Sequence, residues 1–438
     1  MLDIKLLREK PKIIKESQKK RALDEKQIDQ VLDLDKKWRT LKEQVDQLRA
    51  KRNKISIEIS EAKKAKKNAD SLLKEAKLIP EQLADKEKQM SSLLEQRDSL
   101  LKEIPNIVDS SVPIGDAAKN KILKEYGKVK KSKFEHKDHA DILIPLNLLD
   151  IDKASEVAGS RFYYLKGDLV KLNFAVINFA LDLLRNKGFT LMQPPYMLRR
   201  DVLAGAIPLA AFEEMIYKIE GEDLYLIGTA EHAINAYHSQ EVLNPNSLPL
   251  RYAGISPCFR KEAGSHGKDT KGIFRIHQFE KVEQFIFCKP EDSWKEFDLI
   301  LNNTIDIFKA LEIPFRSVCL SSQDIGRIAA KTIDIEGYFP SQKEYRELGS
   351  CSNCTDYQAR RSNIKYQKGD QLDFVHTLNN TAIATERALA CLVDNHQQPD
   401  GSIKIPKALW RYTGFKEIKA KPKGTKKEGK KIVKKAKK

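Results

Sequence analysis

Charged side chains occupy two strand-like segments in which a buried strand would carry mostly apolar residues. The segments flank a Gly-rich polar stretch in residues 251–287, RYAGISPCFRKEAGSHGKDTKGIFRIHQFEKVEQFIF. Side chains alternate between the two faces of a strand, so residues two apart share a face. One face of the first segment carries Cys258, Arg260 and Glu262, and one face of the second carries Arg275, His277, Phe279, Lys281, Glu283 and Phe285. The spacing predicts a β-hairpin with one chemically active face.

The residue types on this face suit ligands that combine an anion, an aromatic ring and an amine. An arginine fork matches phosphate or carboxylate oxygens, a phenylalanine ring stacks on a base, and glutamates accept hydrogen bonds from ammonium or amino groups. ATP and an amino acid together present all three groups. The alternative is a salt-bridged hairpin with a solvated face. The Gly-rich connection and the apolar flanks favour a binding site.

Two further stretches carry polar residues beside predicted helices. Thr229 and Glu231 follow a short apolar strand and are expected on one strand face, where they either line a pocket or cap the next helix. Arg387 lies in a helix rich in small residues, and a buried arginine requires an anion. That anion is either a ligand phosphate or a carboxylate in a structural ion pair. Asn379 and Thr381 precede this helix, where polar side chains can face a substrate.

The cysteines indicate neither a disulfide framework nor a zinc site. The chain has 6 cysteines, at positions 258, 288, 319, 351, 354 and 391, mostly within apolar or motif stretches, as expected of reduced thiols. Cys351 and Cys354 form a CxxC, which is compatible with zinc or redox chemistry. A single CxxC without a second ligand pair at suitable spacing is a weak signal. We therefore expect no zinc and no disulfide.

The N-terminal region predicts two long helices with a coiled-coil seam. Apolar residues recur at spacings of three and four in two runs, separated by the lysine-rich break EAKKAKKNAD. The first run comprises Leu34, Trp38, Leu41, Val45, Leu48, Ile55 and Ile59, interrupted by Arg52; the second comprises Leu83, Met90, Leu94, Leu101 and Ile104, interrupted by Glu87 and Arg97. An antiparallel hairpin is expected. Helices of about 30 residues extend about 45 Å, so the hairpin must project from the body.

Basic residues line the outside of this hairpin. They comprise Lys36, Lys37, Arg39, Lys42, Arg49, Lys51 and Lys54, with Lys63, Lys64, Lys66 and Lys67 near the expected tip. The set is either the solvated face of a coiled coil or a surface for a polyanion. The pattern by itself does not separate the two.

Turn residues and composition divide the remaining chain. The segment LKEIPNIVDSSVPIG ends the second helix and places a domain boundary near residue 110. We expect a charged, irregular lead-in over 116–150, a long amphipathic helix from Arg161 to Asn186 closed by Lys187-Gly188, and a strand that ends in a Pro-Pro pair. Residues 419–438 are predicted to be a lysine-rich disordered tail.

The overall charge favours a polyanionic partner, and the composition argues against a membrane protein. The 438 residues carry a net charge of +17, of which ten lie in residues 416–438. The segment MLDIKLLREKPK has no signal-peptide apolar region, and no run reaches the roughly 20 apolar residues of a membrane span. A cytoplasmic location is expected. No Walker-type GxxxxGK motif occurs.

The motifs together identify a family. FRKEAG followed by GIFRIHQFEKVE resembles motif 2 of the class II aminoacyl-tRNA synthetases in its seryl-tRNA synthetase form, and HTLNNTAIATERALACLVDNHQ resembles motif 3. GFTLMQPPYMLRR resembles motif 1, and MLDIKLLRE opens an arm similar to the tRNA-binding arm of that family. The resemblance covers residues 1–418, and stretches such as IKIPKALWRYTGF are closer to archaeal and eukaryotic cytosolic members.

The resemblance implies an α+β fold in three parts. Residues 1–110 would form the antiparallel helical coiled-coil hairpin that binds tRNA(Ser), and residues 111–418 a class II catalytic domain with an antiparallel sheet flanked by helices. Residues 419–438 would be the tail. It also implies a homodimer, in which motif 1 forms the interface and Pro195 abuts the site of the partner.

The activity implied is that of a serine–tRNA ligase. L-Serine would react with ATP and Mg2+ to give seryl-adenylate and pyrophosphate, and the seryl group would pass to the 3′ end of tRNA(Ser). Whether tRNA(Sec) is also charged stays open. A synthetase-like RNA-binding protein without charging activity is the alternative, and a coiled-coil scaffold would account for the first 110 residues only.

By the same resemblance, the family roles fall on the following residues. Catalysis falls to Arg260, Glu283 and Arg387; serine binding to Thr229, Ala230, Glu231, Arg260, Glu283, Asn379 and Thr381; ATP binding to Arg260, Lys261, Glu262, Ile276, Phe279, Glu347, Leu348, Gly349, Ser350 and Arg387; and Mg2+ to Glu347 and Ser350. Gly349 stands where family members commonly carry a serine, which removes one hydroxyl. The polar loop between Gly264 and Gly272 would reach over ATP and order on binding.

Overall fold

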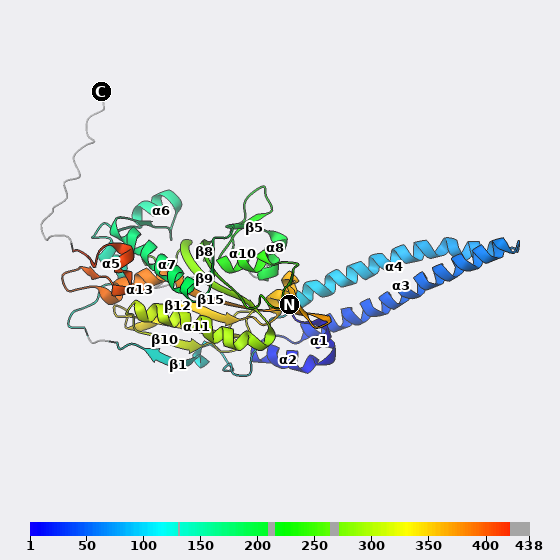
Figure 1. Cartoon of the computed structure of the whole chain (residues 1–438), viewed down its shortest axis with the longest axis horizontal. Helices are drawn as coiled ribbons and strands as arrows, with labels where there is room; N and C mark the ends of the chain where they lie inside the picture. Colours follow the sequence, from blue (N-terminus) through cyan, green and yellow to red (C-terminus); the bar gives the residue numbers. More distant parts are fainter. Residues whose placement is uncertain (130–131, 209–214, 263–270, 421–438) are drawn as a thin grey trace, which may run out of the picture.

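The protein consists of a mixed α/β body from which a long helical hairpin projects (Figure 1). The structure, a computed structural model, describes residues 1–129, 132–208, 215–262 and 271–420. Nearly all of the predicted loop between Gly264 and Gly272, and nearly all of the predicted tail, lie outside the described residues. Within the described ranges, no helix combines the length and apolarity needed to cross a membrane.

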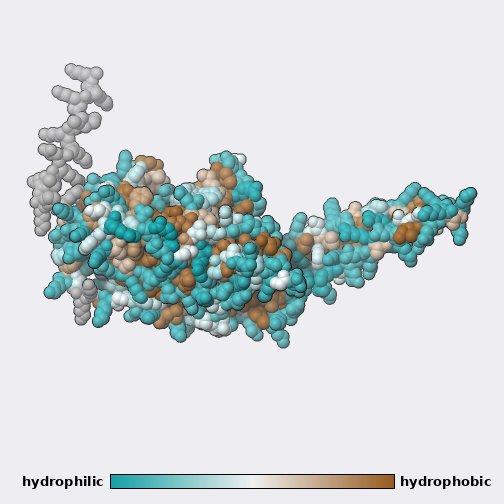
Figure 2. Space-filling view, in the orientation of Figure 1, coloured by the Kyte–Doolittle hydropathy of each residue, from teal (hydrophilic) through white to brown (hydrophobic). Residues whose placement is uncertain are grey.

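The projecting hairpin confirms the two predicted helices and is referred to below as the arm. Helices α3 (Lys26–Lys64) and α4 (Asp70–Glu103) have 39 and 34 residues and lie side by side (Figure 1). At 1.5 Å per residue they extend roughly 50–60 Å, somewhat further than expected. Every residue of the two predicted apolar runs is buried or half-buried, and the basic residues outside them are exposed. Figure 2 shows the arm as a predominantly hydrophilic surface with a few apolar patches.

An ion-pair cluster crosses the seam of the arm and explains one of its interruptions. Asp35 is 0% exposed although it is acidic. The Arg97 Nη1 atom donates to Asp35 Oδ1 at 3.1 Å, and Arg8 donates to both carboxylate oxygens at 2.6 and 2.7 Å. The interrupting arginine of the second run therefore meets a buried carboxylate of the first. Glu87, the other interruption of that run, pairs with Arg49 at 2.8 Å.

The base of the arm is anchored to the body by helices α1 (Ile4–Glu9) and α2 (Pro11–Lys20). Arg21 directly follows α2 and is 7% exposed. Its guanidinium donates to the carbonyls of Asn106, Ile325, Gly326 and Ala329 at 2.7–3.3 Å. Four backbone acceptors thus satisfy one buried cation and connect the arm to the body.

An eight-stranded sheet organises the body. Its spatial order is β1 (Lys121–Tyr126), β10 (Phe315–Cys319), β11 (Lys331–Phe339), β12 (Glu344–Asn353), β15 (His376–Ala384), β9 (Gln278–Cys288), β8 (Leu250–Phe259) and β4 (Thr190–Met192). Neighbouring strands are antiparallel, as predicted, except that β4 runs parallel to β8. The sheet is therefore mixed at this one edge. The predicted hairpin is β8 and β9, and Pro194 and Pro195 follow β4 after one residue, Gln193.

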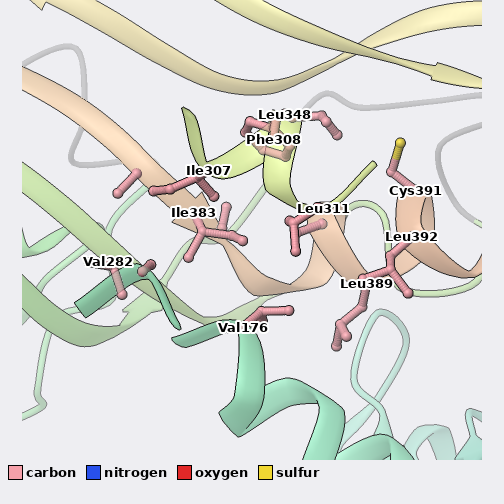
Figure 3. Close-up of a cluster of buried hydrophobic side chains, with 14 of the residues drawn as sticks. Val176, Val282, Ile307, Phe308, Leu311, Leu348, Ile383, Leu389, Cys391 and Leu392 are labelled. Carbon is pink, nitrogen blue, oxygen red and sulfur yellow. The ribbon is translucent and has the colours of Figure 1, made fainter. Parts of the chain in front are cut away.

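Helices cover both faces of the sheet. On one face, α7 (Asp168–Asn186), α11 (Ser293–Ala310) and α13 (Thr385–His396) enclose the main core with even-numbered residues of β9 such as Val282. Figure 3 shows part of this core, with Val282 of β9, Val176 of α7, Ile307 and Phe308 of α11 and Leu389 of α13 among the labelled side chains.

On the opposite face of β9, α10 (Ala230–Tyr237) packs on Phe285 and Phe287. Gly254 of β8 permits the close approach of this helix, because a Cβ atom there would lie 2.6 Å from the Ile234 Cδ1 atom and 2.9 Å from the Ala230 Cβ atom. Past α10, the same face of the hairpin is left open to form the cleft described below.

The remaining elements are short. The helices are α5 (His139–Leu143), α6 (Asp152–Ala158), α8 (Arg200–Ala206), α12 (Tyr357–Ser362) and α14 (Trp410–Thr413). The strands are β2 (Leu149–Asp150), β3 (Tyr164–Leu165), β5 (Met197–Arg199), β6 (Leu224–Leu226), β7 (Val242–Leu243), β13 (Lys365–Lys368), β14 (Gln371–Phe374), β16 (Ile403–Lys404) and β17 (Glu417–Ile418).

Two expectations for the region after the arm were wrong. The segment 116–150 is not wholly irregular, because β1 forms the edge strand beside β10; its residues are almost all exposed, so no apolar pattern marks it. The long helix begins at Asp168 and not at Arg161, because Gly167 adopts φ 57° and Arg161 adopts φ 63°, which an α-helix excludes. Its predicted end at Asn186 is confirmed.

Candidate active site

One cleft gathers almost all of the residues to which the sequence assigned chemistry. It lies on the open face of the β8–β9 hairpin, beside β15 and β12 and the first turns of α10 and α13. Its lining includes Thr229, Glu231, Arg260, Glu262, Ile276, Phe279, Glu283, Glu347, Leu348, Gly349, Ser350, Asn379, Thr381 and Arg387. Residues from four separate motifs thus meet in space.

Strand register brings the carboxylates to the centre of this cleft. Glu283 of β9 lies opposite Gly254 of β8 on one side and opposite Thr381 of β15 on the other. Because α10 sits close to Gly254, its first residues reach the same place. The Thr229 hydroxyl donates to Glu283 Oε2 at 3.4 Å.

Thr229 caps α10 and also lines the cleft. The two interpretations of this stretch, a pocket residue and a helix cap, are therefore both correct. Its Oγ1 atom accepts a hydrogen bond from the Glu231 backbone N–H at 3.3 Å at the start of α10. Glu231 therefore lies in the first turn of α10. The sequence had suggested a strand face for it, and that expectation was wrong. The helix turns its carboxylate toward the cleft, where the Asn379 amide donates to it at 3.1 Å.

The acidic half of the cleft contains two buried carboxylates and one lysine. Glu231 is 9% exposed and Glu283 is 1% exposed. The Lys281 ammonium, 6% exposed, forms an ion pair with Glu283. Burial, followed by the nearby Glu283 charge, raises the pKa of Glu231 to about 7. Two carboxylates that share one cation leave room for a second, which suits the ammonium group of an amino acid.

The other half of the cleft is rich in arginine and aromatic rings. The Arg260 guanidinium lies 5.3 Å from the centre of the Phe279 ring, and its Nε atom donates to the Gly228 carbonyl at 3.1 Å. The Arg387 Nη1 atom lies 2.8 Å from Glu347 Oε1, and the Arg387 guanidinium lies 5.4 Å from the centre of the Phe274 ring. Guanidinium groups beside stacking surfaces suit a nucleotide triphosphate.

Backbone contacts hold Arg260 in place. Its N–H donates to the His277 carbonyl at 2.9 Å, and the His277 ring Nδ1 lies 2.8 Å from the Arg260 carbonyl. His277 therefore braces the hairpin and does not line the cleft. Phe285, which shares its predicted face, is covered by α10. Of the predicted face on the second segment, Arg275, Phe279, Lys281 and Glu283 line the cleft, whereas His277 and Phe285 do not.

Two predicted binding residues do not line the cleft. Ala230, the first residue of α10, is 0% exposed and packs in the cluster with Phe285 and Phe287 of β9. The Lys261 ammonium lies 5.9 Å from the centre of the Tyr217 ring. Both lie between motif residues whose side chains do reach the cleft.

The structure adds five cleft residues to which no role had been assigned. They are Phe274, Arg275, Lys281, Ala384 and Glu386. Alternation along β9 already placed Lys281 between Phe279 and Glu283, so the signal was present for this residue. Glu386 is 4% exposed, and burial raises its pKa to about 7. Its place beside Arg387 in α13 carried no recognisable signal in the sequence.

Gly349 is explained by close packing. A Cβ atom at this position would lie 3.1 Å from the Thr381 Cβ atom and 3.2 Å from its carbonyl oxygen. The missing hydroxyl therefore coincides with a tight contact between β12 and β15, and it does not indicate a damaged site. The neighbouring Ser350 hydroxyl donates to Asp334 Oδ1 at 2.5 Å.

The CxxC cysteines lie inside the core. Cys351 and Cys354 are both 0% exposed, and all six cysteines are free. Among the described residues, no group of three or more histidine, cysteine, aspartate or glutamate side chains is arranged to hold a metal. Burial raises the pKa of both CxxC thiols, which disfavours their reactive thiolate form.

Comparison with known proteins agrees with this geometry. The family model for the seryl-tRNA synthetase N-terminal domain matches residues 1–108, and the model for the class II tRNA synthetase core domain (G, H, P, S and T) matches residues 215–396. The serine–tRNA ligase of Nitrosopumilus maritimus is 47% identical over 417 residues, covering 94% of this chain and 99% of that protein. The chain belongs to the seryl-tRNA synthetase family.

Other seryl-tRNA synthetases extend the similarity. The serine–tRNA ligase of Thermococcus onnurineus is 48% identical over 443 residues, which is 95% of this chain and 97% of that protein. The crystal structure of seryl-tRNA synthetase from Pyrococcus horikoshii complexed with ATP superposes with a TM-score of 0.92 at 45% identity, covering 95% and 99% of the two chains. The Naegleria fowleri enzyme in complex with AMP gives a TM-score of 0.87 at 39% identity, covering 96% and 99%. The similarity thus spans both the arm and the body.

Proposed function

We propose that this chain is a serine–tRNA ligase that activates L-serine with ATP and transfers it to tRNA(Ser). One observation carries the proposal: the motif residues of a family with 47–48% identical serine–tRNA ligases meet in a single cleft that has an acidic half and an arginine-rich half. Each half matches one of the two small substrates.

The arginine-rich half takes ATP. Arg260 would hold the α-phosphate together with the substrate carboxylate, and Arg387 the γ-phosphate. Phe279 would stack on the adenine ring, and Glu262 would accept a hydrogen bond from its amino group. Glu262 already lies within 3.6 Å of Arg275, whose charge keeps this rim of the cleft suited to an anion.

The donor set beside the phosphates fits a magnesium ion. Glu347 and Ser350 both line the cleft and offer oxygen atoms, which are the ligands that hard cations prefer. We assign these two residues to Mg2+, which would neutralise phosphate charge when bound. The buried Asp334 carboxylate accepts from the Ser350 hydroxyl and so fixes its orientation.

The acidic half takes serine. Thr229, Glu231, Glu283, Asn379 and Thr381 would surround the amino acid, with carboxylates on its ammonium group and polar atoms on its hydroxyl. Alanine would leave those polar atoms unpaired, and buried unpaired groups are costly. The extra methyl of threonine has to be excluded by the close packing of this pocket.

Positioning and charge neutralisation account for the chemistry. Held between Arg260 and the acidic residues, the serine carboxylate attacks the α-phosphorus of ATP and displaces pyrophosphate. The terminal ribose hydroxyl of the tRNA then attacks the carbonyl carbon of seryl-adenylate, and AMP leaves. The protein forms no covalent bond in either step.

The arm would bind the tRNA by shape. A rigid basic rod suits A-form RNA, whose deep groove offers little readable sequence, and phosphate contacts by its lysines would give a strong salt dependence. tRNA(Ser) is the proposed partner, and tRNA(Sec) is a further candidate.

We also propose a homodimer in the cytoplasm, where ATP, serine and tRNA meet. β4 is an edge of the main sheet, and its Leu191 side chain is 40% exposed. Pro195, just after this strand, is exposed as well. An open strand edge with exposed apolar residues supports an interface at this place.

Amino-acid-dependent ATP–pyrophosphate exchange tests the proposal. Purified protein with Mg2+ is assayed with serine, threonine, alanine and glycine in turn. We expect exchange with serine and none above background with the other three. A folded protein that shows no exchange with any of them would instead support a non-catalytic RNA-binding role.

A further inference from the structure

A short helix lies between the base of the arm and the acidic half of the cleft. α12 begins at Tyr357, whose ring is 0% exposed and packs in a cluster with Leu7 and Leu101 from the arm region. The Tyr357 hydroxyl donates to the Ile104 carbonyl at 2.9 Å and to the Lys102 carbonyl at 3.3 Å. The end of α4 is therefore held by the first residue of α12.

Other residues of α12 strengthen this contact. The Arg361 Nη1 atom donates to the same Lys102 carbonyl at 2.9 Å. The ammonium group of Met1 donates to the Tyr357 carbonyl at 2.5 Å. Both the beginning of the chain and the end of the arm thus contact one helix of 6 residues.

The next residue of α12 contacts the cleft from behind. Gln358 is 0% exposed, and its Nε2 atom donates to Glu231 Oε1 at 2.7 Å and to the Ala206 carbonyl at 3.2 Å. Its Oε1 atom accepts from the Thr377 hydroxyl at 2.6 Å. Exchanging the amide oxygen and nitrogen would turn an oxygen toward the Glu231 carboxylate, so these partners determine the amide orientation. Gln358 itself does not line the cleft.

The far end of α12 is bound to the helix that carries Glu231. Ser362 accepts from the Asn235 amide of α10 at 2.7 Å, and both residues are buried. One short helix therefore contacts the arm through Tyr357 and Arg361, and the serine side of the cleft through Gln358 and Ser362. We treat a helix this short as one rigid unit. A displacement of α12 at its contacts with the arm would then also displace its contacts near Glu231.

We propose that α12 couples the seating of the arm to serine recognition, with Gln358 as the positioning residue that holds the Glu231 carboxylate. The inference rests on the proposed function, because that function assigns Glu231 to serine. The contacts of the arm with Tyr357 set the position of α12. The hydrogen bond from Gln358 in turn sets the position of the Glu231 carboxylate, which binds the amino acid.

The first test substitutes the buried amide with minimal change of shape. In Gln358→Glu the donor to Glu231 is replaced by a carboxyl group, and a lost hydrogen bond to a charged group corresponds to about a tenfold or greater effect. We expect the serine KM in pyrophosphate exchange to rise at least about tenfold, with kcat at saturating serine and the KM for ATP unchanged.

The pH profile separates positioning from general loosening. Glu231 faces Glu283 and Lys281 of β9 and Arg260 after β8, and its pKa is about 7. It binds ammonium when ionised, so kcat/KM for serine falls as the pH falls below that value. A second carboxyl at 358 raises this pKa further. The acidic limb of the profile therefore moves to higher pH in Gln358→Glu, which a merely structural defect would not cause.

The second test acts from the arm side and has a matched control. Tyr357→Phe removes the hydroxyl that holds the Ile104 and Lys102 carbonyls. Arg327→Ala also removes a contact with the arm base, the donation from Nη1 to the Glu103 carbonyl at 3.2 Å, but this contact bypasses α12. We expect a rise of roughly threefold or more in the serine KM for Tyr357→Phe and no change for Arg327→Ala.

The outcomes are distinct. An unchanged serine KM and pH profile in Gln358→Glu would overturn the positioning role. An equal rise of serine KM in Tyr357→Phe and Arg327→Ala, or no rise in either, would overturn the route through α12. Absence of serine-dependent exchange in the unsubstituted protein would instead overturn the proposed function.

Discussion

The Arg387 guanidinium lies 2.8 Å from the Glu347 carboxylate, across the cleft wall formed by α13 and β12. The first is assigned to the γ-phosphate of ATP and the second to its magnesium ion. On these proposed roles, each residue would neutralise the other until a nucleotide with its bound cation replaced both partners. The structural ion pair and the phosphate ligand, which the sequence left as alternatives for Arg387, are compatible as two states of one site.

Arg387→Ala is expected to abolish most of the activity. The substitution removes a preorganised cation from the triphosphate and leaves Glu347 without its partner, so kcat/KM for ATP in pyrophosphate exchange falls about 100-fold or more. Arg316→Ala is the control, because Arg316 pairs with Glu336 at 2.6 Å in the same sheet but does not line the cleft. Equal losses in both variants would mean that Arg387 acts through stability alone.

Glu283→Gln tests the acidic half. The amide keeps the shape but removes the charge that we propose binds the serine ammonium, so kcat/KM for serine is expected to fall about 100-fold while the KM for ATP stays the same. Glu296→Gln is the control, because Glu296 is a comparably buried carboxylate that pairs with Arg251 at 2.6 Å outside the cleft. Normal serine dependence in Glu283→Gln would contradict the assignment of this residue.

Gly349→Ala tests whether packing explains this glycine. The added Cβ would lie 3.1 Å from the Thr381 Cβ atom, so Thr381 has to shift, at a cost of about 1–3 kcal/mol. We expect the serine KM to rise about fivefold or more, because Thr381 lines the serine side. Gly326→Ala is the control, since a Cβ there meets nothing within 4 Å. An unaffected KM in Gly349→Ala would show that the contact is easily relieved.

Strand alternation explains why so much of the site could be read from the sequence. It placed Phe279, Lys281 and Glu283 on one face before any contact was known, and the structure places all three in the cleft. Two residues that the family resemblance assigned, Ala230 and Lys261, do not line the cleft. They point elsewhere because neighbours along a chain do not share a direction.

Features that depend on distant partners had no pattern to reveal them. Asp35 is an acidic residue inside a coiled-coil seam, and ion pairs with Arg8, Arg39 and Arg97 make its burial tolerable. The edge strand β1 is exposed, so apolar periodicity does not mark it. Gln358 reaches Glu231 from a segment 127 residues away, and a single sequence gives no indication of that contact.

Asp35→Asn is expected to weaken the arm locally. Burial raises the pKa of Asp35, but hydrogen bonds from Arg8 and the other arginines outweigh it, so the pKa lies below the usual 3.8. Its stabilisation is therefore present at neutral pH and lost as the pH falls through that lowered pKa. Breaking the buried cluster costs about 3 kcal/mol, which would lower hydrogen-exchange protection of α3 and α4 near the base about 100-fold.

A control from the same helix separates burial from charge in that experiment. Asp33 pairs with Lys37 at 2.7 Å, but both side chains are more than half exposed, at 58% and 59%. Asp33→Asn is expected to change protection by less than about 0.5 kcal/mol. Similar effects of the two substitutions would contradict the special position of Asp35.

Shortening the arm separates tRNA binding from amino-acid activation. The distal apolar cluster of Val45, Ile55, Ile79 and Leu83 is separate from the cluster at the base. Replacing residues 47–84 by a short Gly-rich turn therefore removes Ile55, Ile79 and Leu83 of the distal cluster and keeps the cluster at the base. Serine-dependent exchange is expected to stay within about twofold, because the cleft is untouched, while charging of tRNA(Ser) falls at least about 100-fold.

A full-length arm with altered charge completes that comparison. Substituting the exposed tip residues Lys63, Lys64, Lys66 and Lys67 by glutamine keeps the rod but removes four phosphate partners. A raised KM for tRNA with a shallower salt dependence would assign binding to charge at the tip. Unchanged charging would place the contact nearer the base, and normal charging by the shortened arm would rule out its proposed role altogether.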